Sequence, residues 1–288
     1  MCGTFILSCV SLINSTMKNI FMLFFLMSYL ISFSQEYFMH DYRMIPEDQI
    51  DNYIENEKHF WSKVAQNLVK EGKITGWAML KREGGSSKEP NFYIYVGIGN
   101  KYNLKYEHTP TFLDGGEKLL KSIDKDAAVL VRRSLNIDSH SVYSVILQRT
   151  NLELNPNSTY NYLKINYCKV NGNIAEFSSM QKNIWGDFIK KSMNEGNGSQ
   201  TLWSTAKKIS PNGNGYNWNF MTIDGYLNYQ DLLVPNWKDS TKFPEAGLDK
   251  INSMMLGGSF YKQVVWKILM SINSRGEFKV HSITKPQK

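Results

Sequence analysis

An acidic side chain, Glu57, interrupts an apolar helical stripe and is the clearest candidate for chemistry in the sequence. Members of the stripe recur at spacings of three and four residues, which predicts one face of a helix, and they are Ile50, Tyr53, Ile54, Glu57, Trp61, Val64 and Leu68. Glu57 follows Ile50 by about two helical turns, so we expect its carboxyl group to point toward the core. Burial raises the pKa of a carboxyl group, which suits a general acid or base. A purely structural hydrogen bond between helix and sheet is the alternative.

His40 is the histidine that the pattern places near this carboxyl group. Phe38, His40 and Tyr42 share one face of a predicted strand at 37–44, because side chains alternate across a strand. The matching face of a later strand is apolar except for Tyr167. We therefore expect this face to meet the helices, with His40 beside Glu57 as a proton-transfer pair. A core histidine with a structural role is the alternative.

The phrase around Glu57 occurs twice. EKHFWSKVAQNLVKEGKITGW at 57–77 is matched by QKNIWGDFIKKSMNEGNGSQTLW at 181–203. Gln181 replaces Glu57 and cannot titrate, so we expect any catalysis in the first copy. The remaining candidates are aromatic side chains that either fill the core or line a ligand pocket together with Gln181, namely Tyr42, Trp61, Trp77, Trp185 and Trp203.

The rest of the chain also reads as two copies of one unit, offset by about 125 residues. YFMHDYRM (37–44) matches YLKINYCK (162–169), and NFYIYVGIGN (91–100) matches YNWNFMTIDG (216–225). The predicted elements of the first copy are a strand at 37–44, a helix at 50–68, strands at 74–82 and 91–99, a helix at 115–135 and a strand at 142–148. Those of the second copy are a strand at 160–169, a helix at 173–195, strands at 200–209 and 216–225, a helix at 245–270 and a strand at 276–284.

The order βαββαβ predicts an α+β fold in which each copy is a ferredoxin-like unit with helices on one face of its sheet. The open sheet faces must be covered, so we expect the two sheets to pack together as a pseudo-dimeric α/β barrel. The predicted boundaries are a signal segment at 1–34, repeat 1 at 35–155 and repeat 2 at 156–288. The chain is then a monomer that contains its own pseudo-dimer.

This organisation resembles the dimeric α/β-barrel superfamily, which includes antibiotic-biosynthesis-type monooxygenases and NIPSNAP-like and EthD-like proteins. The resemblance covers nearly all of the chain after residue 34, as a tandem and exported version. It depends on the element order and on the Glu57/Trp61 and Gln181/Trp185 phrases. It implies a pocket between helix and sheet, and it adds haem ligation, known for histidines of some relatives, as a further option for His40.

The first residues predict export. Lys18, the apolar run 20–31 and the small residues Ser32 and Ser34 are typical of a signal peptide, with translation beginning at Met17. The apolar run is short for a membrane span, so we expect a secreted or periplasmic protein with no stable span after cleavage. Cleavage would leave Cys168 as the single cysteine, which excludes an internal disulfide framework and a cysteine-based zinc site.

Composition and motifs exclude several classes of function. The charges of this mildly basic chain, +7 in total, are interspersed, which disfavours a nucleic-acid partner. GIGN at 97–100 lacks the third glycine of a dinucleotide turn, and the sequence has no metal-ligand spacing, so we predict no metal and no cofactor. We predict an exported protein that binds a small hydrophobic or aromatic ligand. The alternative is a cofactor-light monooxygenase or isomerase with Glu57 and His40 as its acid and base.

Overall fold

A computed structural model of the chain describes residues 36–100, 103–104, 108–137, 140–213 and 215–281. These described residues belong to one compact unit. The predicted signal segment lies outside the described residues. Within the described ranges, no helix is long and apolar enough to cross a membrane.

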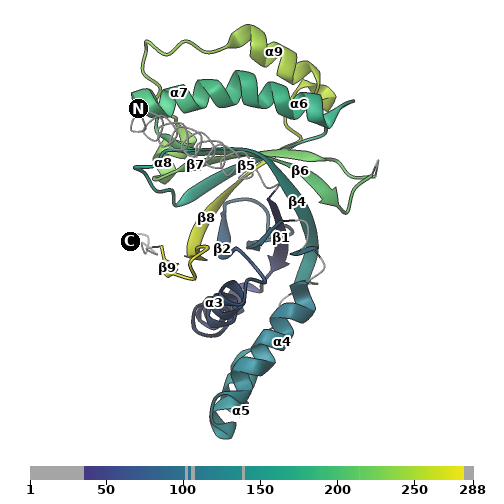
Figure 1. Cartoon of the computed structure of the whole chain (residues 1–288), viewed down its shortest axis with the longest axis vertical. Helices are drawn as coiled ribbons and strands as arrows, with labels where there is room; N and C mark the ends of the chain where they lie inside the picture. The colour runs from purple at the N-terminus through teal and green to yellow at the C-terminus, as the bar shows by residue number, and fades with distance from the viewer. Residues whose placement is uncertain (1–35, 101–102, 105–107, 138–139, 214, 282–288) are drawn as a thin grey trace, which may run out of the picture. The chain divides into compact units, whose positions relative to one another are not determined.

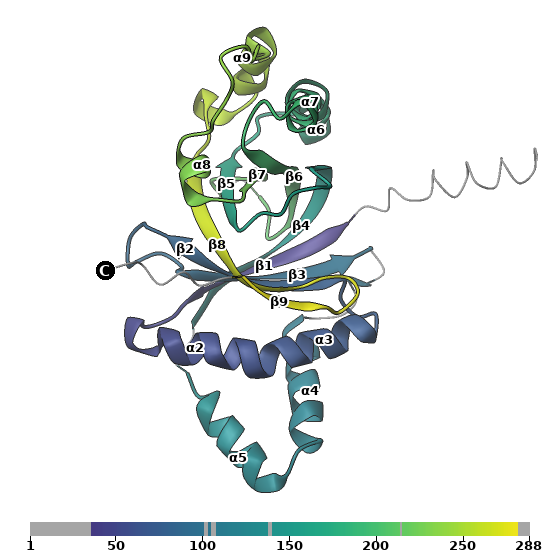
Figure 2. The same ribbon diagram turned by 90° about the vertical axis from the view of Figure 1, so that its left-hand side faces the viewer.

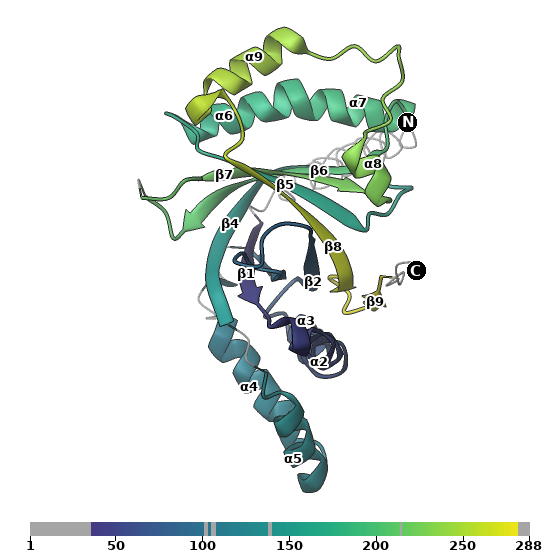
Figure 3. The same ribbon diagram turned by 180° about the vertical axis from the view of Figure 1, so that it is seen from behind.

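The strands form one closed antiparallel barrel (Figure 1). They are β1 (Tyr37–Met44), β2 (Gly76–Glu83), β3 (Phe92–Gly99), β4 (His140–Leu154), β5 (Tyr162–Cys168), β6 (Gln200–Ser210), β7 (Phe220–Tyr226) and β8 (Lys262–Ile272). Their order is β2-β3-β1-β4-β6-β7-β5-β8, and β8 closes the ring by pairing with β2 (Figure 3). A short strand, β9 (Phe278–Val280), lies beside β8.

The two halves repeat one strand order and meet at their edges. β1 to β4 lie in the order β2-β3-β1-β4, and β5 to β8 lie in the order β6-β7-β5-β8. The expectation that two separate sheets pack face to face is therefore wrong in detail. β4 pairs with β6, and β2 pairs with β8, so four sheet edges are satisfied by hydrogen bonds and the predicted open faces become the inside of the barrel.

Helices cover two opposite sides of the barrel (Figure 2). The helical elements are α2 (Ile50–Asn56), a π-helical segment at Glu57–Trp61, α3 (Ser62–Lys70), α4 (His108–Lys121), α5 (Lys125–Ser134), α6 (Ile174–Met180), a π-helical segment at Gln181–Gly186, α7 (Asp187–Glu195), α8 (Tyr229–Leu233) and α9 (Glu245–Ser253). α2 and α3 lie on one side, and α6, α7 and α9 lie on the other (Figure 2).

The predicted helix at 115–135 is two helices. Asp124 separates them, because its carboxylate accepts hydrogen bonds from the backbone N–H groups of Asp126 and Ala127 and so begins α5. α4 and α5 extend beyond α3, away from the barrel (Figure 1).

The prediction of a helix over 245–270 is wrong in its second part. α9 ends at Ser253, and Gly257 and Gly258 follow with positive φ, which breaks the helical path. Val264, Trp266 and Ile268 then alternate inward from β8, in the period of two that a strand requires. The predicted strand at 276–284 overlaps β9 and is not the fourth strand of the second half.

The strand register also corrects the proposed alignment of the third strands. Asn91 hydrogen-bonds both the N–H and the C=O of Ile45, and Asn219 makes the same two bonds to Val170. Asn91 is thus equivalent to Asn219, three positions later than the offset of about 125 predicts. The repeated dipeptide Asn-Phe at 91–92 and 219–220 is the sequence signal for it.

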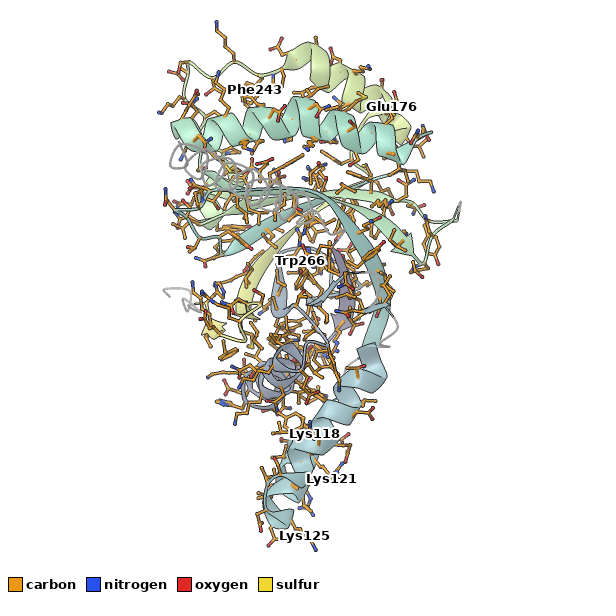
Figure 4. The ribbon with its side chains drawn as sticks, in the orientation of Figure 1. Lys118, Lys121, Lys125, Glu176, Phe243 and Trp266 are labelled. Atoms are coloured by element: carbon orange, nitrogen blue, oxygen red, sulfur yellow. The ribbon has the colours of Figure 1, made fainter. Side chains whose placement is uncertain are left out.

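Apolar side chains form one core inside the barrel and further cores under the helices. The inner core contains Phe38, Tyr42, Tyr93, Tyr167, Trp218 and Trp266 among others. Figure 4 shows Trp266 where the strands cross, between the two helical sides. Because successive side chains of a strand point to opposite faces, neighbouring residues on one strand belong to different cores.

Candidate functional site

A pocket of about 190 Å³ lies between α2–α3, the arm formed by α4 and α5, and the outer face of the first half's strands. Its apolar wall includes Trp61, Trp77, Ile94, Val96, Phe112 and Leu113. Its polar wall is made by Asp41, Arg43, Tyr53, Asn56 and Glu57. The pocket therefore has one ionisable end in an otherwise apolar cleft, which is the usual build of a small-molecule site.

Arg43 organises the polar end. Its Nε donates to Asp41 Oδ2 at 2.8 Å, and its Nη1 donates both to Glu57 Oε1 at 3.2 Å and to the Tyr53 hydroxyl at 3.2 Å. The Ser144 hydroxyl donates to the other Asp41 oxygen at 2.6 Å. Two carboxylates thus share one guanidinium, which leaves this cluster with an excess of negative charge when both are ionised.

The pKa of Glu57 is raised in this cluster. Burial raises the pKa of its carboxyl group, and the opposing effect of the Arg43 guanidinium is smaller. Burial also raises the pKa of Tyr53 well above its usual value, so the phenol stays neutral. Glu57 can therefore hold or release a proton closer to neutral pH than an exposed glutamate can.

A π-helical segment begins at Glu57. The helix pattern predicted a regular helix through 50–68, but Glu57–Trp61 is wound as a π-helix between α2 and α3. The second half has the same feature at Gln181–Gly186. Such insertions re-aim side chains and occur often at functional sites. Here the π-helical segments coincide with the repeated phrase in both halves.

The structure separates His40 from Glu57, so the predicted pairing is wrong. His40 lies inside the barrel with Phe38 and Tyr42, whereas Asp41 and Arg43 point to the outer face beneath the helix. The apolar residues of the second copy's strand suggested a helix-facing surface. They instead line the barrel interior, which is equally apolar because both sheet faces are covered.

His40 is held as a core residue. Its ring stacks on Tyr93 with centroids 4.4 Å apart, and its Nδ1 lies 3.3 Å from the Tyr42 hydroxyl, which in turn is 2.7 Å from the Tyr167 hydroxyl. Burial, reinforced by Arg149, lowers the pKa of His40 to about 3. The imidazole is therefore neutral at physiological pH.

The other side chains predicted to line a ligand pocket lie in different parts of the two halves. Trp61 and Trp77 line the pocket with Glu57, while Tyr42 faces the barrel interior. Gln181 and Trp185 line a corresponding pocket of about 320 Å³ in the second half. Trp203 is fully buried beside Gly186, where an added Cβ would lie 2.7 Å from its ring, so it fills core volume.

The second half has a buried acid that sequence reasoning missed. Asp224 on β7 accepts hydrogen bonds from the side-chain amides of Asn166 (2.8 Å) and Gln200 (2.9 Å), and burial raises the pKa of its carboxyl group. Asp41, Arg43 and Tyr53 were missed as well. The signal for Asp41 and Arg43 was two opposite charges on one face of a strand rich in aromatic residues.

Histidine-ligated haem does not fit the pockets that contain Glu57 and Gln181, because none of the three histidines with described side chains lines either of them. His40 and His281 instead line a cavity of about 390 Å³ inside the barrel. His59 is exposed and pairs with Glu55, and both ring nitrogens of His281 lie within hydrogen-bond distance of Ser271 and Asn161. Among the described residues there is also no cluster of three or more metal-binding side chains.

Comparison with known proteins shows a similarity of fold to several solved structures. No protein-family model and no curated protein sequence matches the chain. Among solved structures, the chain is similar to an anthrone oxidase-like protein (TM-score 0.50, 9% identity, covering 88% of this chain and 98% of that one). It is also similar to a candidate monooxygenase from Fusobacterium nucleatum (0.48, 13%, 87% and 100%) and to the chlorite dismutase from Candidatus Nitrospira defluvii in complex with imidazole (0.46, 10%, 84% and 94%). At these identities the likeness concerns the fold alone, which is a closed antiparallel barrel with helices on its outer side.

Proposed function

We propose that this protein binds a small, mainly apolar ligand in the pocket between α2–α3 and the first half's sheet. The observation that carries the proposal is the arrangement of this pocket, in which an apolar cleft ends at Arg43 and Glu57. Aromatic and aliphatic walls would enclose the body of the ligand. The ionisable end would receive one polar group, such as a phenol or ketone oxygen.

Binding of a neutral aromatic alcohol tests this function. We expect 2-naphthol to raise the Tm of the protein and to bind with 1:1 stoichiometry in calorimetry. Leu113→Trp should fill the mouth of the pocket and weaken binding at least tenfold. Leu130→Trp is the matched control, because Leu130 is also exposed on the same arm but does not line the pocket.

Two results would overturn the proposal. One is the absence of a thermal shift with 2-naphthol and with a wider panel of aromatic alcohols and ketones. The other is binding that Leu113→Trp leaves unchanged.

Acid–base catalysis in the same pocket is the second candidate, and the raised pKa of Glu57 favours it. The carboxylate would accept a proton from a weakly acidic C–H of the ligand. The resulting electron-rich ring could take the proton back at another atom, which is an isomerisation, or could reduce O₂. His40 has no part in this version because it lies on the other side of β1.

Anthrone is a suitable probe for this candidate, because one structural neighbour is described as anthrone oxidase-like. Its oxidation by O₂ gives anthraquinone and water, and both O₂ uptake and quinone absorbance can be followed. We expect Glu57→Gln to lower the rate at least tenfold while the ligand still binds. Retained turnover in Glu57→Gln would exclude the acid–base role, and no turnover in the wild type would leave ligand binding as the function.

We also propose that the chain is a duplicated ferredoxin-like unit and that it is exported. The shared strand order, the paired π-helical segments and the equivalent Asn91 and Asn219 support the duplication. The hydrophobic pattern of residues 17–35 supports export. Mass spectrometry of the mature N-terminus tests the latter, with Gln35 as the expected first residue.

A further inference from the structure

One end of the barrel contains a further cavity, with a lining different from those of the pockets that contain Glu57 and Gln181. Its volume is about 400 Å³, which lies within the range of about 300–1,000 Å³ that small-molecule sites occupy. Aromatic side chains dominate its wall, and they are Tyr42, Tyr143, Tyr167, Tyr216, Trp218, Tyr261 and Trp266. None of the described residues that line it is an aspartate or a glutamate.

Lys208 lies in this cavity as a buried cation. It points inward from β6, with only 2% of its surface exposed, and its Nζ sits 4.0 Å from the ring centre of Tyr216 and 4.3 Å from that of Trp218. These rings supply cation–π attraction but no hydrogen-bond acceptor. Burial, with a smaller effect of Lys169, lowers the pKa of Lys208 to about 8, so the side chain is still mostly charged at neutral pH.

The other cations at this end already have partners. Arg82 and Lys262 both form ion pairs with Glu89. The buried indole N–H of Trp266, in contrast, lies near the Tyr167 hydroxyl but has no acceptor with hydrogen-bond geometry. The cavity thus offers an ammonium group that faces aromatic rings, and an indole N–H beside the Tyr167 hydroxyl. A buried indole N–H normally has an acceptor.

We propose that this end of the barrel is a second binding site, which takes a small aromatic carboxylate. The ligand's carboxylate would pair with the Lys208 ammonium, and its ring would lie among the tyrosines and tryptophans of the wall. A single cation that has no ion-pair partner among the residues the structure describes favours a singly charged anion. A phosphate group would call for the forked donors of arginine, and Arg82 is committed to Glu89.

Calorimetric titration with benzoate and indole-3-carboxylate tests the proposal on the intact protein. We expect both anions to bind, and the neutral isostere benzamide to bind at least tenfold more weakly than benzoate. Cyclohexanecarboxylate should also bind more weakly, because it lacks a planar ring. Ligand-observed NMR in the same buffer would report contact between the benzoate ring and the protein.

Lys208→Met should weaken benzoate binding at least tenfold. Its matched control is Lys207→Met, because Lys207 is the adjacent residue on β6, points to the opposite face and does not line the cavity. Trp266→Phe keeps an aromatic side chain but removes the N–H and part of the ring surface, and we expect a loss of several-fold. Thermal unfolding of each variant shows whether it is folded.

The site is independent of the pocket that contains Glu57. Leu113→Trp should therefore leave benzoate binding unchanged, and 2-naphthol should not compete with benzoate. Failure of benzoate and indole-3-carboxylate to bind the folded wild type would overturn this proposal. So would equal affinity in Lys208→Met and Lys207→Met, or equal affinity for benzoate and benzamide.

Discussion

At the scale of single residues, Glu57 and Gln181 show how one substitution separates two equivalent positions. Both residues begin a π-helical segment, and both are buried. Glu57 has Arg43 beside it, whereas β5 has Cys168 at the position equivalent to Arg43. The first half therefore contains an ion-paired cluster, and the second half contains amide groups around Asp224.

Glu57→Gln should change how stability depends on pH. The folded state raises the pKa of Glu57 above the unfolded value of 4.5, so the folded protein holds a proton that the unfolded chain releases. The free energy of unfolding of the wild type, relative to Glu57→Gln, should therefore be highest below pH 4.5 and should fall as pH rises through the folded pKa. The loss is about 1.4 kcal/mol for each unit by which the pKa is raised.

Urea unfolding between pH 4 and pH 8 measures this difference. Glu176→Gln is the control, because Glu176 lies exposed on α6 (Figure 4). A difference between wild type and Glu57→Gln that stays constant or grows with pH would contradict the assignment of a raised pKa.

Arg43→Met should destabilise the protein by about 3 kcal/mol at pH 7. The change removes the shared cation and leaves two buried carboxylates near each other, and uncompensated buried charge is costly. Arg275→Met removes an ion pair with Glu277 that is well exposed, so its effect on stability should be much smaller. Chemical denaturation of both variants gives the comparison, and equal effects would show that the cluster is not energetically important.

At the scale of elements, the contact between α3 and α4 shapes the pocket. Gly115 lets the two helices approach closely, since a Cβ there would lie 2.8 Å from Val64 Cγ1. Gly116 similarly faces the ring of Trp61, with a distance of 3.3 Å from a built Cβ. Phe112 and Leu113 on the same helix contribute to the pocket wall, so the position of α4 determines whether the pocket is enclosed.

Gly115→Leu should push α4 away from α3 and lower the free energy of unfolding by about 1–3 kcal/mol, as overpacking does. It should also weaken 2-naphthol binding, because the pocket wall moves. Asp114→Leu adds the same side chain at the neighbouring exposed position and should be nearly neutral. Equal stability of the two variants, measured by denaturation, would show that the helices are not in close contact.

At the scale of the whole described unit, closure of the barrel joins the halves. The pairings of β4 with β6 and of β2 with β8 cross between them. Either half alone would expose two strand edges and the apolar face that forms the inner core. The halves are therefore interdependent, although their strand orders are the same.

Residues 35–155 and 156–288, produced separately, should each fail to give a stable monomer, and together they should reassemble. Light scattering with size-exclusion chromatography measures the species, and thermal unfolding measures cooperativity. A monomeric half with a sharp unfolding transition would show that barrel closure is dispensable.

The sequence predicted much of the architecture because its signals are local. Most strands were predicted to within a few residues, as was the helix that carries the repeated phrase in each half. The signals were the alternation in YFMHDYRM, the periodic stripe from Ile50 to Leu68 and the repeated tryptophan phrase. The prediction failed at KQVVWKIL, which forms strand β8, because the helix predicted before it was extended through a pair of glycines. It also missed the π-helical segments, which shift the face of a helix without changing the order of apolar residues.

The face on which His40 lies was decided only by the tertiary structure, as were the partners of Glu57 and the exposure of Lys208. An apolar strand face is compatible with a helix layer and with a barrel interior, so its pattern cannot distinguish them. Closure of the barrel brings together residues from β1, β4, β6 and β8 that are far apart in the chain. Local residue order determined the elements, because their periods depend on backbone geometry, whereas the sites depend on contacts between elements that only the closed fold creates.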